Sequence, residues 1–524
     1  VKPCLRLFQV EKPMSLRPSA WPFALPWAAS AALLLCSCAV GPDYKTPTVA
    51  MPPKFVTQGD FATQEPLLAW WQVLSDENLT ALIERAISGA NLDLQSAAAR
   101  IREARAQLGV ASAAELPSVN ANAQISRDRF SRNSELFANL PLPSPQLTFT
   151  DYRAGFDASW EIDVFGYVRR SVEAADARVQ SAQANLHDVR VSVAAEVART
   201  YIGLRQTEAQ IALGTADLSA LQESARLVEL RFGAGNANEL ELHRANASIQ
   251  TQVALLAALR ADNGAALNAL AVLVGVTPAE VMTLVKPDQP VPSVRPDRVA
   301  VGLPSDLLQR RPDVRRAERE LAAATADIGV ATANLYPRFT LIGNFGAESV
   351  QPGEFWQLAS RTWSLAPHAS LPLLGRGRLT SEVSAREAAR DAALAGYQKA
   401  VLQALSDVEA AMIRYDRARV RDASLDQAAR DFKANAALVH EQFDAGRSSK
   451  IDLLDAERQE RQAQEQRVDA AANLATQLVA LYKALGGGWV ESASASAQHS
   501  EPTEDPANFD AKKTSTVAAK SSSL

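Results

Sequence analysis

Cysteine and histidine are the residues of this chain that could do metal, redox or nucleophilic chemistry, and both are scarce. The 524 residues contain three cysteines and five histidines, and the histidines lack the spacing of metal ligands. The chain has no nucleotide-binding glycine loop and no nucleophile elbow. All three cysteines precede residue 39, so the body of the chain has neither a disulfide framework nor a thiolate metal site. These patterns argue against an enzyme and leave the N-terminus as the place where cysteine chemistry matters.

Cys38 lies at the end of a segment with the features of a secretory signal. The apolar run Ala28–Leu35 is too short to span a bilayer but suits a signal peptide. In the motif Leu35-Cys36-Ser37-Cys38, a branched apolar residue stands three places before Cys38 and a small residue stands directly before it, as in a bacterial lipobox. We expect a signal peptide over residues 1–37, a diacylglycerol and a fatty acyl group on Cys38, and no other cofactor. The alternative is an ordinary cleaved signal with two incidental cysteines.

The rest of the chain contains one unusual pattern twice. Although the chain has 27 prolines, none lies within residues 146–277 or 373–501, and each of these windows contains a similar turn. The turns are Phe232-Gly233-Ala234-Gly235 and Phe443-Asp444-Ala445-Gly446, which lie 443 − 232 = 211 residues apart. A duplication in register predicts one structure with internal pseudo-symmetry. The expected divisions are a lipidated N-terminal segment (38–75), a first repeat (76–290), a second repeat (291–486) and a disordered C-terminal tail (487–524).

Each repeat contains two stretches in which polar and apolar residues alternate. The alternation is strict over residues 118–126 and 152–163, and looser over 339–347 and 363–371, where Pro367 lies on the apolar face. Runs of this length with an aromatic-rich apolar face are typical of transmembrane β-strands, although a half-buried sheet of a soluble protein alternates in the same way. Four strands are too few to close a barrel, since about eight is the practical minimum. If the strands cross a membrane, several copies of the chain must therefore share one barrel.

A long helical hairpin follows the second strand of each pair. Residues 166–275 and 378–485 are rich in helix formers, and each segment reverses once, at its glycine turn. A single helix from Gly166 to Phe232 would extend about 100 Å. The apolar stripe of such a helix stabilises nothing unless another helix covers it, so the hairpins need partners. Their small apolar seams and charged outer positions favour a wide tube of helices with a wet interior.

With the repeats laid out, the chain resembles the TolC superfamily of outer-membrane efflux proteins, and within it the NodT-type lipoproteins of resistance–nodulation–division (RND) pumps. The most specific part of the match is the run Leu303–Val314, and the match as a whole covers about residues 38–490. The other segments that carry the resemblance are Cys38–Tyr44, Trp70-Trp71, Trp160–Gly166, Glu318, Leu335-Tyr336-Pro337 and the two glycine turns.

The resemblance implies a homotrimer that is mainly α-helical, with a 12-stranded β-barrel in the outer membrane and a helical tunnel across the periplasm. Each chain would contribute two tandem repeats, each with two transmembrane strands and a long coiled-coil hairpin. The implied function is the exit duct of a tripartite RND-type efflux pump, which exports drugs or other small toxic compounds passively. The implied partners are a periplasmic adaptor (membrane fusion) protein, an inner-membrane RND pump and outer-membrane lipid. Ala39, in place of the aspartate that usually retains lipoproteins at the inner membrane, agrees with this location.

The resemblance also implies functional positions at the far ends of the hairpins. In the family, the tips of the second hairpin close the tunnel, and carboxylates repeated around such a ring would repel anions and attract cations. The matching gate positions are Ile451, Asp452, Asp455 and, in the first repeat, Glu241. The residues that match the adaptor-docking tips are Phe232, Gly233, Gly235, Phe443, Gly446 and Arg447. The plain alternative is that the acidic residues are merely solvated and the glycines only reverse the chain.

Two other functions fit parts of the same pattern. One is the outer-membrane factor of a type I or other export system, and the other is a lipid-anchored periplasmic coiled-coil adaptor that does not conduct. A nucleic-acid-binding role does not fit, because the net charge is −5, with 54 basic and 59 acidic residues spread along the chain.

Overall fold

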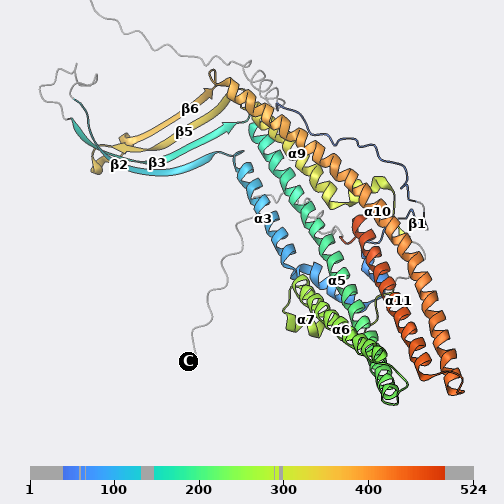
Figure 1. Cartoon of the computed structure of the whole chain (residues 1–524). Coiled ribbons are helices and arrows are strands. Elements are labelled where there is room, and N and C mark those ends of the chain that lie inside the picture. Colours follow the sequence, from blue (N-terminus) through green and yellow to red (C-terminus); the bar gives the residue numbers. More distant parts are fainter. Residues whose placement is uncertain are drawn as a thin grey trace, which may run out of the picture.

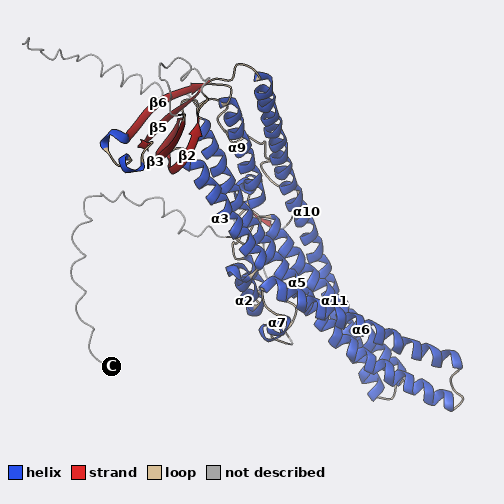
Figure 2. Cartoon of the chain, turned by 90° about the vertical axis from the view of Figure 1, so that its left-hand side faces the viewer, coloured by secondary structure: helices blue, strands red, loops and turns tan. Residues whose placement is uncertain are grey.

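The computed structural model describes residues 39–489, except residues 58, 60, 65, 132–146, 288 and 294–298. Cys38, the expected signal peptide and the expected tail beyond residue 489 lie outside the described residues. A curved sheet projects from one end of a bundle of long helices (Figure 1). The tips of the two helical hairpins lie at the opposite end of the bundle (Figures 1 and 2).

The four alternating segments form one antiparallel sheet in the order β2-β3-β5-β6. The strands are β2 (Ser118–Arg129), β3 (Thr148–Ile162), β5 (Arg338–Ser349) and β6 (Arg361–Ser370). The β2–β3 hairpin extends beyond the predicted ranges because Arg127–Arg129 pair with Thr148–Thr150. In these residues polar and apolar side chains no longer alternate, so the sequence pattern did not mark them as strand. Their backbone groups still need hydrogen-bond partners, and the pairing supplies them. In this order β3 and β5 are central, and β2 and β6 are the two edges of the sheet.

The strand register gathers apolar side chains on one face of the sheet and polar side chains on the other. Phe156 lies opposite Phe345 in the β3–β5 pair, and Phe345 lies opposite Trp363 in the β5–β6 pair. These side chains are exposed, Phe345 at 58% and Trp363 at 76%. On the other face, Asp157 lies opposite Asn344. A half-buried sheet of a soluble protein would cover its aromatic face, whereas this sheet leaves it open, as a surface in contact with lipid would be.

Each strand is joined to a helix, and the helices repeat the order of the strands. α3 (Leu92–Ala113) leads into β2 and α9 (Pro312–Ala333) leads into β5. α5 (Tyr167–Gly233) follows β3 and α10 (Arg376–Asp444) follows β6. α5 packs against both α3 and α9, and α9 packs against α10. The helical layer therefore runs α3-α5-α9-α10, and its outer members are continuous with the two edge strands (Figure 1).

The two long helices turn back as shorter ones, α6 (Glu239–Val274) and α11 (Lys450–Ala484). Asn238 and Ser449 cap these helices, because each side chain accepts a hydrogen bond from the backbone N–H three residues on. The two hairpins lie side by side, since α11 packs against α5 as well as against α10. Among the described residues no single helix is long and apolar enough to cross a bilayer; α6 and α7 (Pro278–Leu284), bent by 95° at their break, pass that test only together.

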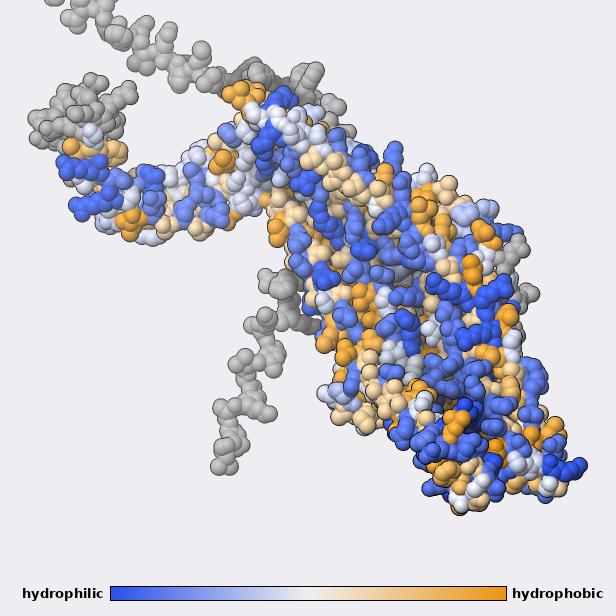
Figure 3. Space-filling model, in the orientation of Figure 1, coloured by the Kyte–Doolittle hydropathy of each residue, from blue (hydrophilic) through white to orange (hydrophobic). Residues whose placement is uncertain are grey.

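The main hydrophobic core lies in the middle of the bundle. Trp70 is fully buried there and stacks on Tyr482 of α11, with ring centroids 5.9 Å apart. The smaller elements around it are β1 (Phe61–Ala62), its parallel partner β4 (Val299–Ala300), η1 (Trp70–Leu74), α2 (Glu77–Arg85), η2 (Ala86–Ala90), η3 (Pro304–Asp306) and α8 (Leu307–Arg310). The connection between β5 and β6 contains η4 (Pro352–Glu354) and η5 (Leu358–Ser360). On the face seen in Figure 3, hydrophilic residues cover most of the helical body, which suits a surface in water.

Candidate functional site

The tip of the first hairpin ends α5 with a turn that depends on glycine. The N–H of Gly235 donates to the carbonyl of Phe232 at 2.9 Å, and the N–H of Asn236 donates to the carbonyl of Arg231 at 2.7 Å. Gly235 has φ 75°, a left-handed conformation that favours glycine. The bond that spans six residues is that of a Schellman motif, which satisfies carbonyl groups at the end of a helix.

The tip of the second hairpin repeats these bonds. The N–H of Gly446 donates to the carbonyl of Phe443 at 2.9 Å, and the N–H of Arg447 donates to the carbonyl of Gln442 at 2.8 Å. Gly446 has φ 67°. Because 446 − 235 and 447 − 236 both equal 211, the offset seen in the sequence is also an equivalence of backbone structure at the tips.

Most of the tip residues that are expected to contact an adaptor are exposed at the surface. Phe232 and Arg447 are exposed, and a Cβ built on Gly233 would meet nothing within 4 Å. Phe443 is half-buried, with Nζ of Lys450 lying 5.3 Å from its ring centre in a cation–π contact. The two tips therefore present Phe232 and Arg447 openly, whereas Phe443 is partly covered by Lys450.

The expected gate residues lie at the starts of the two returning helices. Ile451, Asp452 and Asp455 lie in the first two turns of α11. Glu241 is the third residue of α6, the place that Asp452 has in α11. The N–H of Asp452 donates to Oγ of Ser449 at 3.2 Å, and Oδ2 of Asp452 accepts from the N–H of Ser449 at 3.0 Å. Hydrogen bonds from Ser449 lower the pKa of Asp452, so this carboxylate also serves as a helix cap.

Glu241 and Asp455, two of the expected gate residues, differ in whether a cation lies beside the carboxylate. Oε2 of Glu241 lies 3.9 Å from Nη1 of Arg231, across the first turn. Asp455 is exposed, and its side chain forms no hydrogen bond or ion pair with another residue of the described chain. Of these two expected gate carboxylates, Glu241 therefore has a cation beside it and Asp455 does not.

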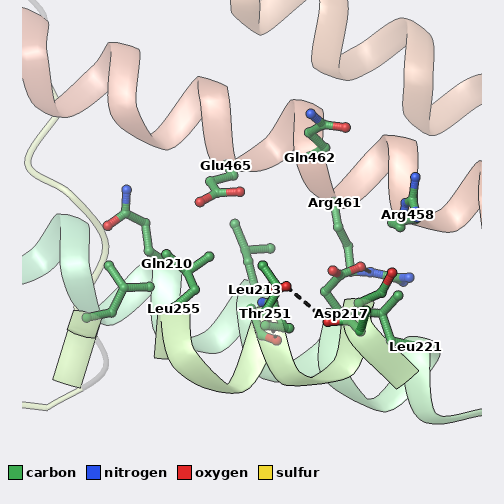
Figure 4. A pocket seen from close by; sticks show the side chains of 15 residues that line it. Gln210, Leu213, Asp217, Leu221, Thr251, Leu255, Arg458, Arg461, Gln462 and Glu465 are labelled. Atoms are coloured by element: carbon green, nitrogen blue, oxygen red, sulfur yellow. Dashed lines mark hydrogen bonds and ion pairs between the residues drawn. The ribbon is translucent and has the colours of Figure 1, made fainter. Parts of the chain in front are cut away.

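A polar groove of about 420 Å³ lies between α5, α6 and α11 (Figure 4). Arg461 of α11 pairs with Asp217 of α5 at 3.4 Å, and Asp469 of α11 accepts a hydrogen bond from Gln210 of α5 at 2.6 Å. Burial raises the pKa of Glu465, and the charges of Asp469 and Asp217 add to that effect. In the described residues no three histidine, cysteine, aspartate or glutamate side chains are arranged to hold a metal ion. The groove was missed from the sequence because its charges come from separate helices.

Residues 39–57, the N-terminal strap, begin at the junction of sheet and helices (Figure 1). The N–H of Val40 donates to the carbonyl of Phe165 at 3.1 Å, directly before α5. Nη2 of Arg170, a residue of α5 that is 5% exposed, lies 2.6 Å from Oδ1 of Asp43. The strap is therefore fixed to the bundle by a backbone hydrogen bond and a largely buried cation.

The run Leu303–Val314 is a junction in the structure. Arg311, which is 8% exposed, donates two hydrogen bonds to Asp313, at 3.0 and 2.7 Å. It also donates to Asp407 of α10 and to the carbonyl of Ala484 of α11, each at 3.1 Å. Burial favours a higher pKa for Asp313, but hydrogen bonds and charge from Arg311 outweigh it and hold that pKa below its usual value. This Arg311 junction joins the start of α9 to α10 and α11.

Comparison with known proteins gives similarity along most of the chain. The profile described as "Outer membrane efflux protein" matches residues 82–276 and 303–487. The chain is 30% identical over 468 residues to Nodulation protein T of Rhizobium leguminosarum bv. viciae, covering 88% of this chain and 93% of the relative. It is 28% identical over 471 residues to the toluene efflux pump outer membrane protein TtgI of Pseudomonas putida, covering 88% of this chain and 97% of the relative. The solved structure of the outer-membrane channel OprN matches with a TM-score of 0.77 and 33% identity, covering 86% of this chain and 100% of that chain.

Proposed function

The chain belongs to the family of outer membrane efflux proteins, and we propose that three copies of it form the exit duct of a tripartite RND-type pump. The protein is an outer-membrane channel rather than an enzyme, and its helical body extends into the periplasm. Its partners in this proposal are a periplasmic adaptor, an inner-membrane RND pump and the lipid of the outer membrane. The name of TtgI refers to toluene efflux. For the present chain we propose drugs or other small toxic compounds as the class of exported substrate.

The observation that carries this proposal is that the two edge strands of the sheet are continuous with the two outer helices of the helical layer. β2 and β6 are the edges of the sheet, and α3 and α10 are the outer helices. In lipid, each unpaired backbone group of an open strand edge costs several kcal/mol. Both edges gain partners if β6 and α10 of one copy meet β2 and α3 of the next. The start of α10 supports this pairing, since residues 376–391 are almost all exposed and such a helix needs a partner.

The number of copies follows from the width of the barrel. Two copies would give about eight strands, whose interior is filled by side chains. Three copies would give about 12 strands and leave room for a wet lumen lined by the polar face of the sheet. With the two repeats assigned to residues 76–290 and 291–486, the ring would then contain six repeats, with first and second repeats in alternation.

Membrane fractionation and mass measurement test the duct. We expect the mature protein to resist carbonate extraction and to purify in detergent with the mass of three chains, and to give current steps in planar bilayers. The periplasmic adaptor considered from the sequence would instead be released as a soluble protein once its acyl group is removed. A carbonate-soluble monomer without current steps would contradict the proposal.

We also propose that Cys38 carries the lipid anchor. The support is the position of the strap, because a Cβ at Gly166, the turn into α5, would lie 3.0 Å from Cα of Ala39. Ala39, the residue that follows Cys38 in the sequence, therefore lies at the strand–helix junction, which is the level of the inner leaflet if the sheet spans the membrane. Mass spectrometry of the mature N-terminus should find a diacylglycerol and a fatty acyl group, and Cys38→Ser should lack both. An unmodified N-terminus in the wild-type protein would refute the assignment.

The gate and the adaptor contacts are assigned to the tips. Ile451 and Asp455 would narrow the tunnel, with Asp452 holding the start of α11 and Glu241 marking the equivalent place in the first repeat. The proposed adaptor contacts are Phe232, Gly233, Gly235, Phe443, Gly446 and Arg447. A cysteine at position 447 should cross-link to an adaptor hairpin. A cysteine at exposed position 402 of α10, far from the tip, should not.

A further inference from the structure

The repeats indicate how neighbouring copies pair, provided that the copies close a barrel as proposed above. Gly166 and Gly375 both have φ 83° and precede the helices that follow β3 and β6, which sets an offset of 375 − 166 = 209. Pro117 and Pro337 stand directly before β2 and β5, which sets an offset of 337 − 117 = 220. Adding 209 to a position in β3 gives the equivalent position in β6, and subtracting 220 from a position in β5 gives the equivalent position in β2. The β3–β5 pairing inside one chain therefore predicts a β6–β2 pairing between two chains.

The conversion places arginines together. Tyr152 pairs with Ser349 inside the chain, and 152 + 209 with 349 − 220 gives Arg361 opposite Arg129 of the partner subunit. A pairing inside the chain checks these offsets. The offsets convert the β2–β3 pair of positions 118 and 159 to positions 338 and 368 in β5 and β6, and in the structure position 338 pairs with position 370. The predicted register is therefore accurate to within two residues. Arg127 of the partner subunit lies two residues along on the same face. In each of these registers Arg361 therefore lies opposite or diagonal to an arginine of the other copy.

These three arginines have no counter-charge in the part of the chain that the structure describes. Arg127, Arg129 and Arg361 are exposed, and none forms a side-chain hydrogen bond or ion pair with any residue that the structure describes. By parity along their strands they belong to the apolar face. Arg153, near the same end of the sheet but on the polar face, pairs with Glu348 at 2.9 Å. Three cations at one subunit junction repel one another unless an anion lies between them.

An apolar crevice of about 540 Å³ adjoins Arg361 on the same face. Phe156, Phe345 and Trp356 contribute aromatic walls, Ala154 leaves room between them, and no acidic residue lines the crevice. This end of the sheet is the one farthest from the helices (Figure 1), so it lies toward the outer leaflet. A cationic rim beside an apolar crevice has the two parts of a site for a lipid with a phosphate group and acyl chains.

We propose that each subunit junction binds a phosphate-bearing lipid of the outer leaflet. Arg361 and, from the partner subunit, Arg127 and Arg129 hold the phosphate, since arginine binds phosphate oxygens through paired N–H donors. One acyl chain lies in the crevice between Phe156 and Phe345. The lipid completes the junction by neutralising cations that closure of the barrel brings together.

Native mass spectrometry of trimers taken from phosphatidylcholine nanodiscs containing lipid A tests this site. We expect lipid A to bind the wild-type trimer at up to three sites. Arg361→Gln should weaken that binding about fivefold, and the combined Arg127→Gln, Arg129→Gln and Arg361→Gln variant about 100-fold. Ala154→Leu, which fills the crevice, should also reduce binding. Arg153→Gln is the matched control on the polar face and should bind as the wild type does.

The outcomes separate this inference from the proposed function. Intact trimers that bind lipid A equally in the wild type and the triple arginine variant would overturn the lipid site and leave the barrel standing. Absence of trimers in the wild type would overturn the barrel itself. Displacement of lipid A by inorganic phosphate at equal concentration, with no effect of Ala154→Leu, would show a simple anion site and overturn the assignment to lipid.

Discussion

Removal of the Arg311 guanidinium should loosen the middle of the bundle without unfolding it. In Arg311→Met the aliphatic stem is kept, but Asp313, Asp407 and the Ala484 carbonyl lose a charged donor. Removal of one partner from a buried ion pair costs about 3–5 kcal/mol. Because the side chains of Asp313 and Asp407 are 26% and 37% exposed, solvent screens part of this loss. We therefore expect local destabilisation of about 2–3 kcal/mol.

Hydrogen exchange of the detergent-solubilised protein measures this local free energy. The last turn of α11 and the turn of α10 that contains Asp407 meet at Arg311, so their hydrogen-bonded backbone amides report on opening of the Arg311 junction. A loss of about 2–3 kcal/mol corresponds to exchange about 30- to 150-fold faster in these turns. Amides at the hairpin tips should change little, because they do not contact this junction.

Arg417→Met is the matched control, since Arg417 lies on α10 with its side chain 78% exposed and pairs with Asp416 at 3.6 Å. An exposed pair contributes about 0–1 kcal/mol, so exchange should change by less than about fivefold. Arg311→Met combined with Asp313→Asn should recover part of the loss, because it leaves one buried charge fewer without a partner. If Arg311→Met accelerates exchange no more than Arg417→Met does, the reasoning about the junction is wrong.

Three further predictions test the tips and the groove. Asp455→Ala should raise conductance in planar bilayers, because it removes from each copy a side chain that we propose narrows the tunnel; unchanged conductance here and in the double variant with Asp452→Ala would remove the gate assignment. Gly446→Ala should cost about 1–2 kcal/mol because of its left-handed φ, whereas Gly233→Ala should be neutral or stabilising by up to about 1 kcal/mol; equal melting temperatures for the two variants would contradict the turn geometry. Burial and neighbouring acids raise the pKa of Glu465, so its ionised form weakens the fold above the unfolded pKa of about 4.3. Glu465→Gln should therefore raise the melting temperature at pH 7 and have little effect at pH 4, and an effect that does not depend on pH would refute this account.

Local patterns in the sequence predicted the elements because their causes are local. The alternation over 339–347 lies within β5, and the glycine at 446 is required by a backbone angle that few other residues adopt. The capping role of Asp452 could also have been foreseen, since Ser449 followed three residues later by an acidic residue fits a capping box. The sequence-based prediction assigned Asp452 to the gate alone, because the resemblance to the family points to that role.

Partners that depend on tertiary packing had no sequence signal. Arg311 bonds to Asp407, 96 positions away, and to the carbonyl of Ala484, 173 positions away. Arg461 and Asp217 meet because α11 lies against α5, which nothing in either helix alone indicates. The resemblance marked Leu303–Val314 as specific but did not say what its arginines contact. The structure shows that Arg311 of this run joins three helices, α9, α10 and α11.

Cross-linking between copies tests most directly the claim that β6 of one subunit pairs with β2 of the next. Phe156 lies opposite Phe345, and the two repeat offsets convert this pair to positions 365 and 125. Leu365 and Ile125 are both exposed on the apolar face, so the variant Leu365→Cys/Ile125→Cys is accessible to a short bismaleimide that spans direct and diagonal neighbours about 5–8 Å apart. We expect covalent dimers and trimers, and nothing larger, on a denaturing gel, with only monomers from either single variant. A membrane-inserted double variant that stays monomeric on the gel would contradict the account.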